Sequence, residues 1–303
     1  MIKQLTLAGI FFIILFIARV PVDFSFLAAN GGEASPLSPR EEKEELSREA
    51  KFDLEAKSAY VFDIAENKII YEKNSSESRP LASLAKLMTA ILFDEKVPDG
   101  SYVEISDVAI GQPESEGLAP GDRFKKEDIL GLMMVHSSND AAWAAAEAAG
   151  AGDVDNFVRM MNKRARELGL ASLSFANPHG LDIKTEEGRL PGDLGNAADI
   201  AKLLGHVYKN YPEILAKTKI KNLEVISESG KIITSENTNE AIEDIPRLVG
   251  AKTGFTVLSG GNLVFIFEPV PGKPILVSIL GSSEKGRFDD ARKIVGELSE
   301  YYK

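Results

Sequence analysis

The fold is decided by residues 250–280, GAKTGFTVLSGGNLVFIFEPVPGKPILVSIL, because this segment contains two long apolar runs rich in β-branched and aromatic residues. The runs cover 262–267 and 274–280, and both have the composition of β-strands. Two more strand-like runs, 59–64 and 68–71, lie near the other end of the chain around an Asn-containing turn. We therefore expect a hairpin there, and a sheet that joins the two ends of the folded region.

The segment between these strands has the periodicity of helices. Apolar residues recur at helical spacing in five stretches, and a last amphipathic helix is expected after the final strand. Asp153 and Asn196 are placed to act as N-caps. The order of elements predicts one α+β domain. The six predicted helices are 84–93, 126–134, 140–149, 154–168, 197–208 and 289–301.

Composition excludes several classes of protein. The 303 residues carry a formal net charge of -11, with 46 acidic and 35 basic side chains. Nonspecific nucleic-acid binding requires a basic footprint, so no nucleic-acid partner is expected. Cysteine is absent, which excludes disulfides and thiolate metal sites.

The N-terminus has the pattern of an export segment. Residues 5–18, LTLAGIFFIILFIA, form an apolar run between Lys3 and Arg19. The run is shorter than the roughly 20 residues that span a bilayer, so a cleaved signal and a retained membrane anchor both stay open. We assign 1–29 to this segment and 30–55, rich in Gly, Ser, Pro and charge, to a flexible stalk. Both alternatives place the rest of the chain outside the cytoplasm.

Three short motifs occur in order along the predicted domain. They are S-x-x-K at 83–86, S-S-N at 137–139 and K-T-G at 252–254. Each motif alone has little weight, since 282–285 also fits S-x-x-K and 235–237 also fits S-x-N. Their order and separation are typical of enzymes that acylate an active serine.

The residue types in these motifs fit nucleophilic catalysis by serine. A hydroxyl needs a nearby base, and the i, i+3 spacing places the amine of Lys86 beside Oγ of Ser83. A lysine with an ordinary pKa is almost entirely charged at pH 7, so Lys86 has to be buried or placed near another cation. Lys252 is expected to supply that charge and to attract an anionic substrate. Ser137 is expected to relay a proton, and Asn139 to hold Lys86 and the substrate.

Two backbone amides are also expected to stabilise the transition state. Backbone N–H groups of Ser83 and Phe255 are candidates for an oxyanion hole, in which one donor is typically worth about 3 kcal/mol. Gly254 has no side chain and therefore lets the substrate approach the strand.

Other catalytic classes have weaker support. His136, His179 and His206 do not accompany a G-x-S-x-G elbow, and no H-E-x-x-H pair is present. We interpret the three histidines as structural and expect no metal and no cofactor. Trp143 lies among alanines beside the second motif and is interpreted as a core residue.

Residues 55–303 resemble the serine D-Ala-D-Ala carboxypeptidases, the low-molecular-mass penicillin-binding proteins of peptidase family S11. The resemblance rests on RPLASLAKLMT at 79–89, SSNDA at 137–141, FANPHGL at 175–181 and GAKTGFT at 250–256. It implies a β-lactamase-like transpeptidase fold, with an antiparallel sheet of about five strands from both chain ends, flanking helices and an all-helical lobe. It also implies that 56–303 form the catalytic domain, with any membrane tether at the N-terminus.

The resemblance further implies peptidoglycan stem peptides as substrates and β-lactam antibiotics as acylating ligands. It implies that Arg287 helps Lys252 and Thr253 to bind the terminal carboxylate of the substrate. The expected catalytic residues are Ser83, Lys86, Ser137 and Asn139, and the expected substrate-binding residues are Lys252, Thr253, Gly254, Phe255 and Arg287.

Three alternatives remain at this stage. A serine β-lactamase would need a glutamate to direct the deacylating water, and Glu167 lacks the full E-x-x-L-N setting. A noncatalytic binding protein of the same fold would lack the serine or the lysine, and both are present. Transpeptidation differs only in the acyl acceptor. Ser138 departs from the family, which usually has glycine at that position.

Overall fold

The structure is a computed structural model, and it describes residues 52–113 and 117–302. The predicted export segment at 1–29 and nearly all of the predicted stalk at 30–55 lie outside these described residues. Within the described ranges, no helix is both long enough and apolar enough to cross a membrane.

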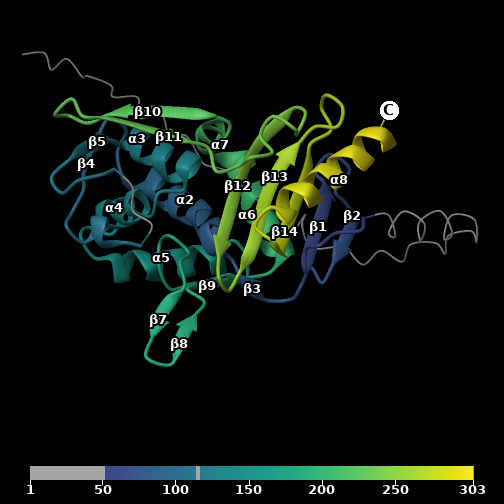
Figure 1. The fold of residues 1–303 in the computed structure, drawn as a ribbon, viewed down its shortest axis with the longest axis horizontal. Coiled ribbons are helices and arrows are strands. Elements are labelled where there is room, and N and C mark those ends of the chain that lie inside the picture. Colours follow the sequence, from purple (N-terminus) through teal and green to yellow (C-terminus); the bar gives the residue numbers. More distant parts are fainter. Residues whose placement is uncertain (1–51, 114–116, 303) are drawn as a thin grey trace, which may run out of the picture. The chain divides into compact units, whose positions relative to one another are not determined.

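A five-stranded antiparallel sheet joins the two ends of the described chain (Figure 1). The prediction of such a sheet is therefore confirmed. The strand that carries the K-T-G motif lies at one edge of the sheet, and the predicted hairpin forms the other edge. The strands in spatial order are β12 (Leu248–Thr256), β13 (Gly260–Phe267), β14 (Ile275–Ser282), β1 (Ser58–Asp63) and β2 (Lys68–Lys73).

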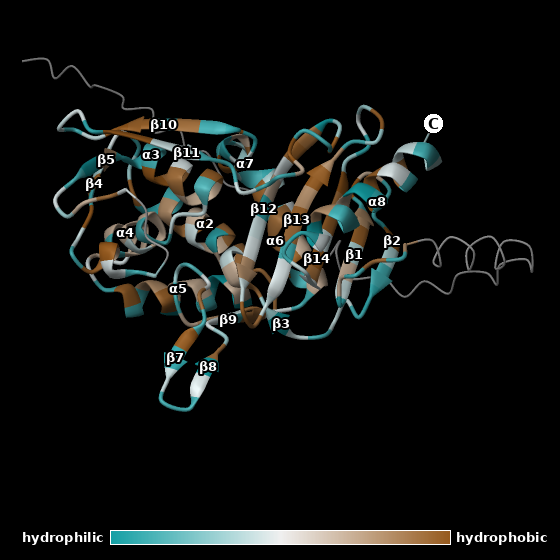
Figure 2. Cartoon of the chain, viewed as in Figure 1, coloured by the Kyte–Doolittle hydropathy of each residue, from teal (hydrophilic) through white to brown (hydrophobic). Residues whose placement is uncertain are grey.

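The sheet separates two hydrophobic cores. Along β13, Leu263, Phe265 and Phe267 belong to the core that α8 (Gly286–Tyr301) covers, whereas Val264 and Ile266 belong to the core on the other face. Successive side chains of a strand point to opposite faces, so a strand buried on both sides is apolar throughout. This explains the unbroken apolar runs, which appear as hydrophobic strands in Figure 2.

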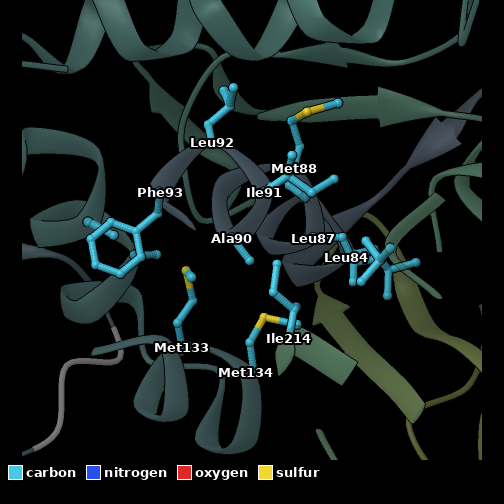
Figure 3. Close-up of a cluster of buried hydrophobic side chains, with 14 of the residues drawn as sticks. Leu84, Leu87, Met88, Ala90, Ile91, Leu92, Phe93, Met133, Met134 and Ile214 are labelled. Atoms are coloured by element: carbon cyan, nitrogen blue, oxygen red, sulfur yellow. The ribbon is translucent and has the colours of Figure 1, made fainter. Parts of the chain in front are cut away.

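The second core belongs to the helical lobe. Its centre is α2 (Lys86–Lys96), whose first eight residues are all buried. Side chains of α2 lie close to Met133, Met134 and Ile214 in Figure 3. The other lobe helices are α3 (Lys126–Gly131), its π-helical continuation η4 (Leu132–His136), α4 (Asn139–Ala149), α5 (Val154–Glu167), α6 (Ala197–Asn210), which packs on the sheet, and α7 (Pro212–Thr218).

Both predicted N-caps are confirmed. The side chain of Asp153 accepts a hydrogen bond from the backbone N–H of Asn156, and that of Asn196 accepts one from Asp199. The predicted last helix begins three residues early, at Gly286, because the Ser283 hydroxyl accepts the Gly286 N–H. The predicted helix at 126–134 is α-helical only as far as Gly131 and then continues as η4.

Several short elements were not predicted. One is the three-stranded sheet β3–β9–β6, in which β9 lies between the other two strands. The others are helix α7, the 3₁₀ turns and three small two-stranded sheets. The bounds are β3 (Arg79–Pro80), β9 (Asp193–Gly195), β6 (Ser174–Phe175), η2 (Ala82–Ala85), η3 (Ala109–Gly111), β4 (Tyr102–Glu104), β5 (Arg123–Lys125), β7 (Ile183–Thr185), β8 (Gly188–Leu190), β10 (Asn222–Ile226) and β11 (Ile232–Glu236).

The packing of α8 on the sheet yields a stability prediction. Ile294 is fully buried on this helix, so Ile294→Ala should lower the free energy of unfolding by about 2–5 kcal/mol through lost contacts and a residual cavity. Glu297→Ala on the exposed face should change it by less than about 0.5 kcal/mol. Urea unfolding followed by circular dichroism measures both values. Equal stability of the two variants would contradict this account of the core.

Candidate active site

The first motif begins in a 3₁₀ turn rather than in α2 itself. Ser83 lies in η2, and Lys86 is the first residue of α2. A 3₁₀ helix has three residues per turn, so positions i and i+3 lie directly above one another. Ala82 holds a left-handed backbone conformation, with φ of 50°, immediately before the serine. The expected i, i+3 contact is therefore produced by a tighter helix than the one predicted.

The turn is held against the sheet by a buried amide. The Asn262 side chain donates to the backbone carbonyls of Pro80 and Leu81, each at 3.0 Å, and accepts the Gly281 N–H at 2.8 Å. Asn262 is fully buried, so these bonds fix the turn relative to β13 and β14.

Gly254 allows β12 to approach the same turn. A Cβ atom at this position would lie 3.0 Å from the Leu81 carbonyl oxygen and 3.1 Å from the Ser83 nitrogen. These distances are shorter than ordinary van der Waals contacts, so a larger residue would push the strand away. Gly254 therefore lets β12 lie close to the Ser83 turn. The expected oxyanion hole, formed by the N–H groups of Ser83 and Phe255, requires this close approach.

Lys86 is fully buried, and its amine contacts three oxygen atoms. Its Nζ lies 2.8 Å from Ser83 Oγ, 2.7 Å from Asn139 Oδ1 and 2.8 Å from the carbonyl oxygen of His179. A neutral amine has two N–H groups and one lone pair. If the two N–H groups donate hydrogen bonds to the amide and carbonyl oxygens, the lone pair faces the serine hydroxyl. In this arrangement a neutral Lys86 would be placed to accept the proton of the serine hydroxyl.

The second motif is presented by an unusual helix end. The π-helical segment η4 ends at His136. The next residue, Ser137, has a left-handed φ of 66°, and α4 begins at Asn139. Ser138 has a negative φ, and its hydroxyl accepts the Ala141 N–H at 3.1 Å as the N-cap of α4. A glycine is therefore not required at 138, where serine has a capping role. The Asn139 amide donates to the Pro113 carbonyl at 2.9 Å.

Lys252 on β12 is buried beside the second serine. Its Nζ donates to Ser137 Oγ at 2.8 Å and to the Thr253 carbonyl at 3.0 Å. Burial, and then the charge of Arg287, lower the pKa of Lys252 to about 7. The predicted effect of Lys252 on the charge of Lys86 stays a prediction.

Arg287, the second residue of α8, lies beside the K-T-G strand. Its guanidinium donates to the Gly254 carbonyl at 2.8 Å and lies over the rings of Phe288 and Phe255, at 4.6 and 6.0 Å from their centroids. Its buried Nε has no hydrogen-bond partner in the described part of the chain. Burial lowers the pKa of Arg287 from its ordinary value.

These groups meet in one cleft of about 260 Å³. The hydroxyl of Thr238, before β12, adds a 2.5 Å hydrogen bond with Thr253. Lys86 and Lys252 are buried behind the serines that they contact. The lining residues are Ser83, His136, Ser137, Ser138, Asn139, Thr238, Thr253, Gly254, Phe255, Glu284 and Arg287.

The competing motif and His179 have other roles, whereas His136, interpreted from the sequence as structural, lines the cleft. Ser282 donates to Asp290 at 2.9 Å, so the second S-x-x-K does not form a similar pair. Burial, and then the charge of Lys86, lower the pKa of His179 to about 3, and its neutral ring stacks on Trp143. The carbonyl of His179 is a contact that the sequence analysis missed, although the FANPHGL pattern marked its loop.

The described fold and the conjunction of three motifs in one cleft define a protein of the penicillin-binding type. The chain belongs to the D-alanyl-D-alanine carboxypeptidase family, peptidase family S11, whose sequence profile matches residues 44–271.

Individual relatives agree with this assignment. The chain is 34% identical over 220 residues to D-alanyl-D-alanine carboxypeptidase DacF of Bacillus subtilis, covering 71% of this chain and 54% of that protein. It is 30% identical over 248 residues to a D-alanyl-D-alanine endopeptidase of Escherichia coli, covering 78% and 75%. The crystal structure of penicillin-binding protein D2 from Listeria monocytogenes with bound ampicillin has a TM-score of 0.67 at 26% identity, covering 82% and 98%. The chain spans 54–63% of the length of the first three curated relatives.

The buried amine of Lys252 yields a prediction for stability. The unfolded lysine keeps its ordinary pKa of 10.5, whereas the folded one has a pKa of about 7. Lys252 therefore lowers the free energy of unfolding at every pH at which the unfolded amine is protonated. This penalty is largest below pH 7 and decreases progressively as the pH rises to 10.5. Lys252→Met should stabilise the fold at pH 7 by roughly 2–5 kcal/mol.

Urea unfolding at pH 7 and at pH 10 measures this effect. The stability advantage of Lys252→Met should shrink at the higher pH, while Lys293→Met on the exposed side of α8 should show no such trend. An unchanged or reversed difference between the two pH values would contradict the pKa shift.

Proposed function

We propose that this chain is a serine-type D-Ala-D-Ala carboxypeptidase that acts on peptidoglycan stem peptides through an acyl-enzyme on Ser83, and that penicillins acylate the same serine. One observation carries the proposal: Nζ of a fully buried lysine lies 2.8 Å from a serine hydroxyl that faces an open cleft. A positioned base at this distance is what activates a serine nucleophile. The family assignment supports the proposed substrate class.

Acylation begins when Oγ of Ser83 attacks the carbonyl carbon of the penultimate D-Ala and its proton passes to Nζ of Lys86. The backbone N–H groups of Ser83 and Phe255 are proposed to stabilise the oxyanion. The C–N bond to the terminal residue then breaks, and Ser137 delivers a proton to the leaving amine. The 2.8 Å contact with Lys252 allows Ser137 to be reprotonated. Free D-alanine departs.

Deacylation reverses these roles. Before deacylation, Lys86 loses the proton taken from Ser83 to water in the cleft, and Lys252 regains one. Water then attacks the acyl carbon and gives a proton to the neutral Lys86, and the ester bond to Ser83 Oγ breaks as Lys86 passes this proton to the serine. The sequence of steps needs only the described side chains, the peptide and water. An amine in place of water would give transpeptidation by the same intermediate.

The terminal carboxylate of the substrate is proposed to bind at the end of the cleft formed by Arg287 and Thr253. The buried Nε of Arg287 has no partner in the described structure, and the Thr253 hydroxyl already faces Thr238. A guanidinium suits a carboxylate because both are planar.

Two alternatives have less support. Glu167 is half-exposed, forms ion pairs with Lys163 and Arg164, and does not line the cleft, which argues against its use as a β-lactamase base. A noncatalytic binding protein would not need a buried lysine amine in contact with a serine hydroxyl, as Lys86 and Ser83 are here.

The setting proposed for this activity is the cell envelope outside the cytoplasm. The apolar run at 5–18 supports export, followed either by retention as an N-terminal membrane anchor or by secretion after cleavage. In that compartment the stem peptides and β-lactams are the proposed ligands.

The nucleophile can be identified by mass spectrometry of the intact protein after exposure to benzylpenicillin. The wild type should gain one penicilloyl group on the peptide that contains Ser83, with few penicillin turnovers. Ser83→Ala should lose the adduct and all D-alanine release, while Ser282→Ala, in the competing motif, should keep both. An adduct on Ser83→Ala, or rapid multiple turnover by the wild type, would refute the proposal.

The carboxylate site can be tested with paired peptides. Arg287→Gln removes the cation, so kcat/KM for a peptide ending in D-Ala-D-Ala should fall about 100-fold. The same peptide with an amidated C-terminus should be a poor substrate of the wild type and should lose little further activity in the variant. Equal losses for both peptides would show that Arg287 acts through the fold rather than through the carboxylate.

A further inference from the structure

Strand β9 connects the two segments that supply the proposed nucleophile and a contact of the proposed base. It pairs with β3 just before the Ser83 turn and with β6 just before the loop that contains His179. Its first residue, Asp193, accepts the Leu81 N–H at 3.0 Å through the backbone carbonyl. Its side-chain Oδ1 accepts the N–H groups of Ala176 and Asn177, at 2.7 and 3.3 Å.

The loop that Asp193 holds has a defined shape. Oδ1 of Asn177 accepts the N–H groups of His179 and Gly180, at 3.2 and 2.6 Å, and its Nδ2 donates to the Leu181 carbonyl at 2.9 Å. Gly180, with φ of 90°, lies against the Ala82 backbone, where an added Cβ would be 2.0 Å from the carbonyl oxygen. The loop therefore presents the His179 carbonyl to Lys86 in one orientation.

We infer that Asp193 is a positioning residue for the base Lys86: its carboxyl group fixes the loop that presents the His179 carbonyl, and its charge controls the balance between the ammonium and amine forms of Lys86. This inference rests on the proposed function, because it assigns the role of base to Lys86. Nothing in the sequence patterns singled out Asp193, which the mechanism above does not use.

The surroundings of the carboxyl group support electrostatic coupling. Asp193 is 1% exposed, and its Oδ2 has no hydrogen-bond partner among the described residues. Its Oδ1 is linked to Lys86 through the hydrogen bonds of the loop, from the Asn177 backbone and side chain to His179, whose carbonyl contacts Nζ of Lys86. Burial raises the pKa of Asp193 to about 7, against the opposing effects of the two amide hydrogen bonds and of the charge on Lys86. The charge on Lys86 thus acts on Asp193, and by the same attraction an ionised Asp193 acts on Lys86.

The sign of the coupling follows from the charges that face Asp193. Ionised Asp193 stabilises the ammonium form of Lys86, whereas neutral Asp193 does not. In the loop after β6, His179 is neutral and Asp182 accepts from Thr256 and Leu258, while Arg79 on β3 donates to Ser58 and Glu77. Removing the charge at 193 should thus favour the amine.

Asp193→Asn tests this inference because asparagine keeps an oxygen acceptor for the two amides and removes the charge. The measured quantity is the second-order rate of benzylpenicillin acylation between pH 5 and pH 9. The acid limb of this profile should move to lower pH by at least about half a unit in the variant. Asp193→Ala also loses the acceptor, and its acylation should fall at least about 10-fold below that of Asp193→Asn at every pH.

Asp290 offers a matched control. It too is 1% exposed and accepts two backbone N–H groups, of Glu55 and Ala56, but it is a residue of α8, the helix that covers the opposite face of the sheet. Asp290→Asn should leave the position of the acid limb unchanged, and thermal unfolding confirms that each variant is folded.

The outcomes separate the two proposals. If the wild type is not acylated on Ser83, the proposed function fails. If the wild type is acylated but folded Asp193→Asn keeps the wild-type pH profile, the charge coupling is wrong. If folded Asp193→Ala is acylated as fast as Asp193→Asn at every pH, Asp193 does not position the loop either. An acid limb that moves to higher pH would also overturn the inference.

Discussion

The structure of the site depends on the burial of the Lys86 amine, which contacts three protein oxygen atoms instead of water. Lys86 is fully buried, and its contacts come from the 3₁₀ turn, from α4 and from the loop after β6. Because a buried lysine without partners is costly, each of these segments has to be held accurately. The Asn262 amide, the β3–β9–β6 sheet and the N-cap of α4 are best understood as the means of holding them.

The same arrangement occurs a second time across the cleft. Lys252 is also buried with its Nζ 2.8 Å from a serine hydroxyl, and Ser137 is held in a left-handed conformation where a π-helical segment ends. Two lysine–serine pairs therefore lie at one cleft. The lysine of one pair belongs to the helical lobe, and the lysine of the other belongs to the edge strand of the sheet. The two hydrophobic cores on either face of the sheet supply the rigidity that such buried polar pairs require.

Much of this could be predicted from the sequence, for physical reasons that differ between elements. The strands at 262–267 and 274–280 are long and apolar because they are buried on both faces, and that pattern is visible locally. The three motifs revealed the side chains of the cleft. The left-handed Ser137 and the π-helical turn were not predictable, since no residue in LMMVH requires them. The contacts of the His179 carbonyl and of Asp193 were missed because a backbone oxygen or a single aspartate in a two- or three-residue strand carries no periodic signal.

Electrostatics would connect the proposed carboxylate-binding end of the cleft with the proposed proton relay. Arg287 is one of the two causes that lower the pKa of Lys252, and a substrate carboxylate bound beside Arg287 would offset that charge. The bound anion would then favour a protonated Lys252, which is the form able to return a proton to Ser137. A substrate without the carboxylate would leave Lys252 closer to its neutral form. Recognition of the terminal residue and delivery of a proton to the leaving amine would in this way depend on the same pair of cations, and selectivity would arise in the chemical step as well as in binding.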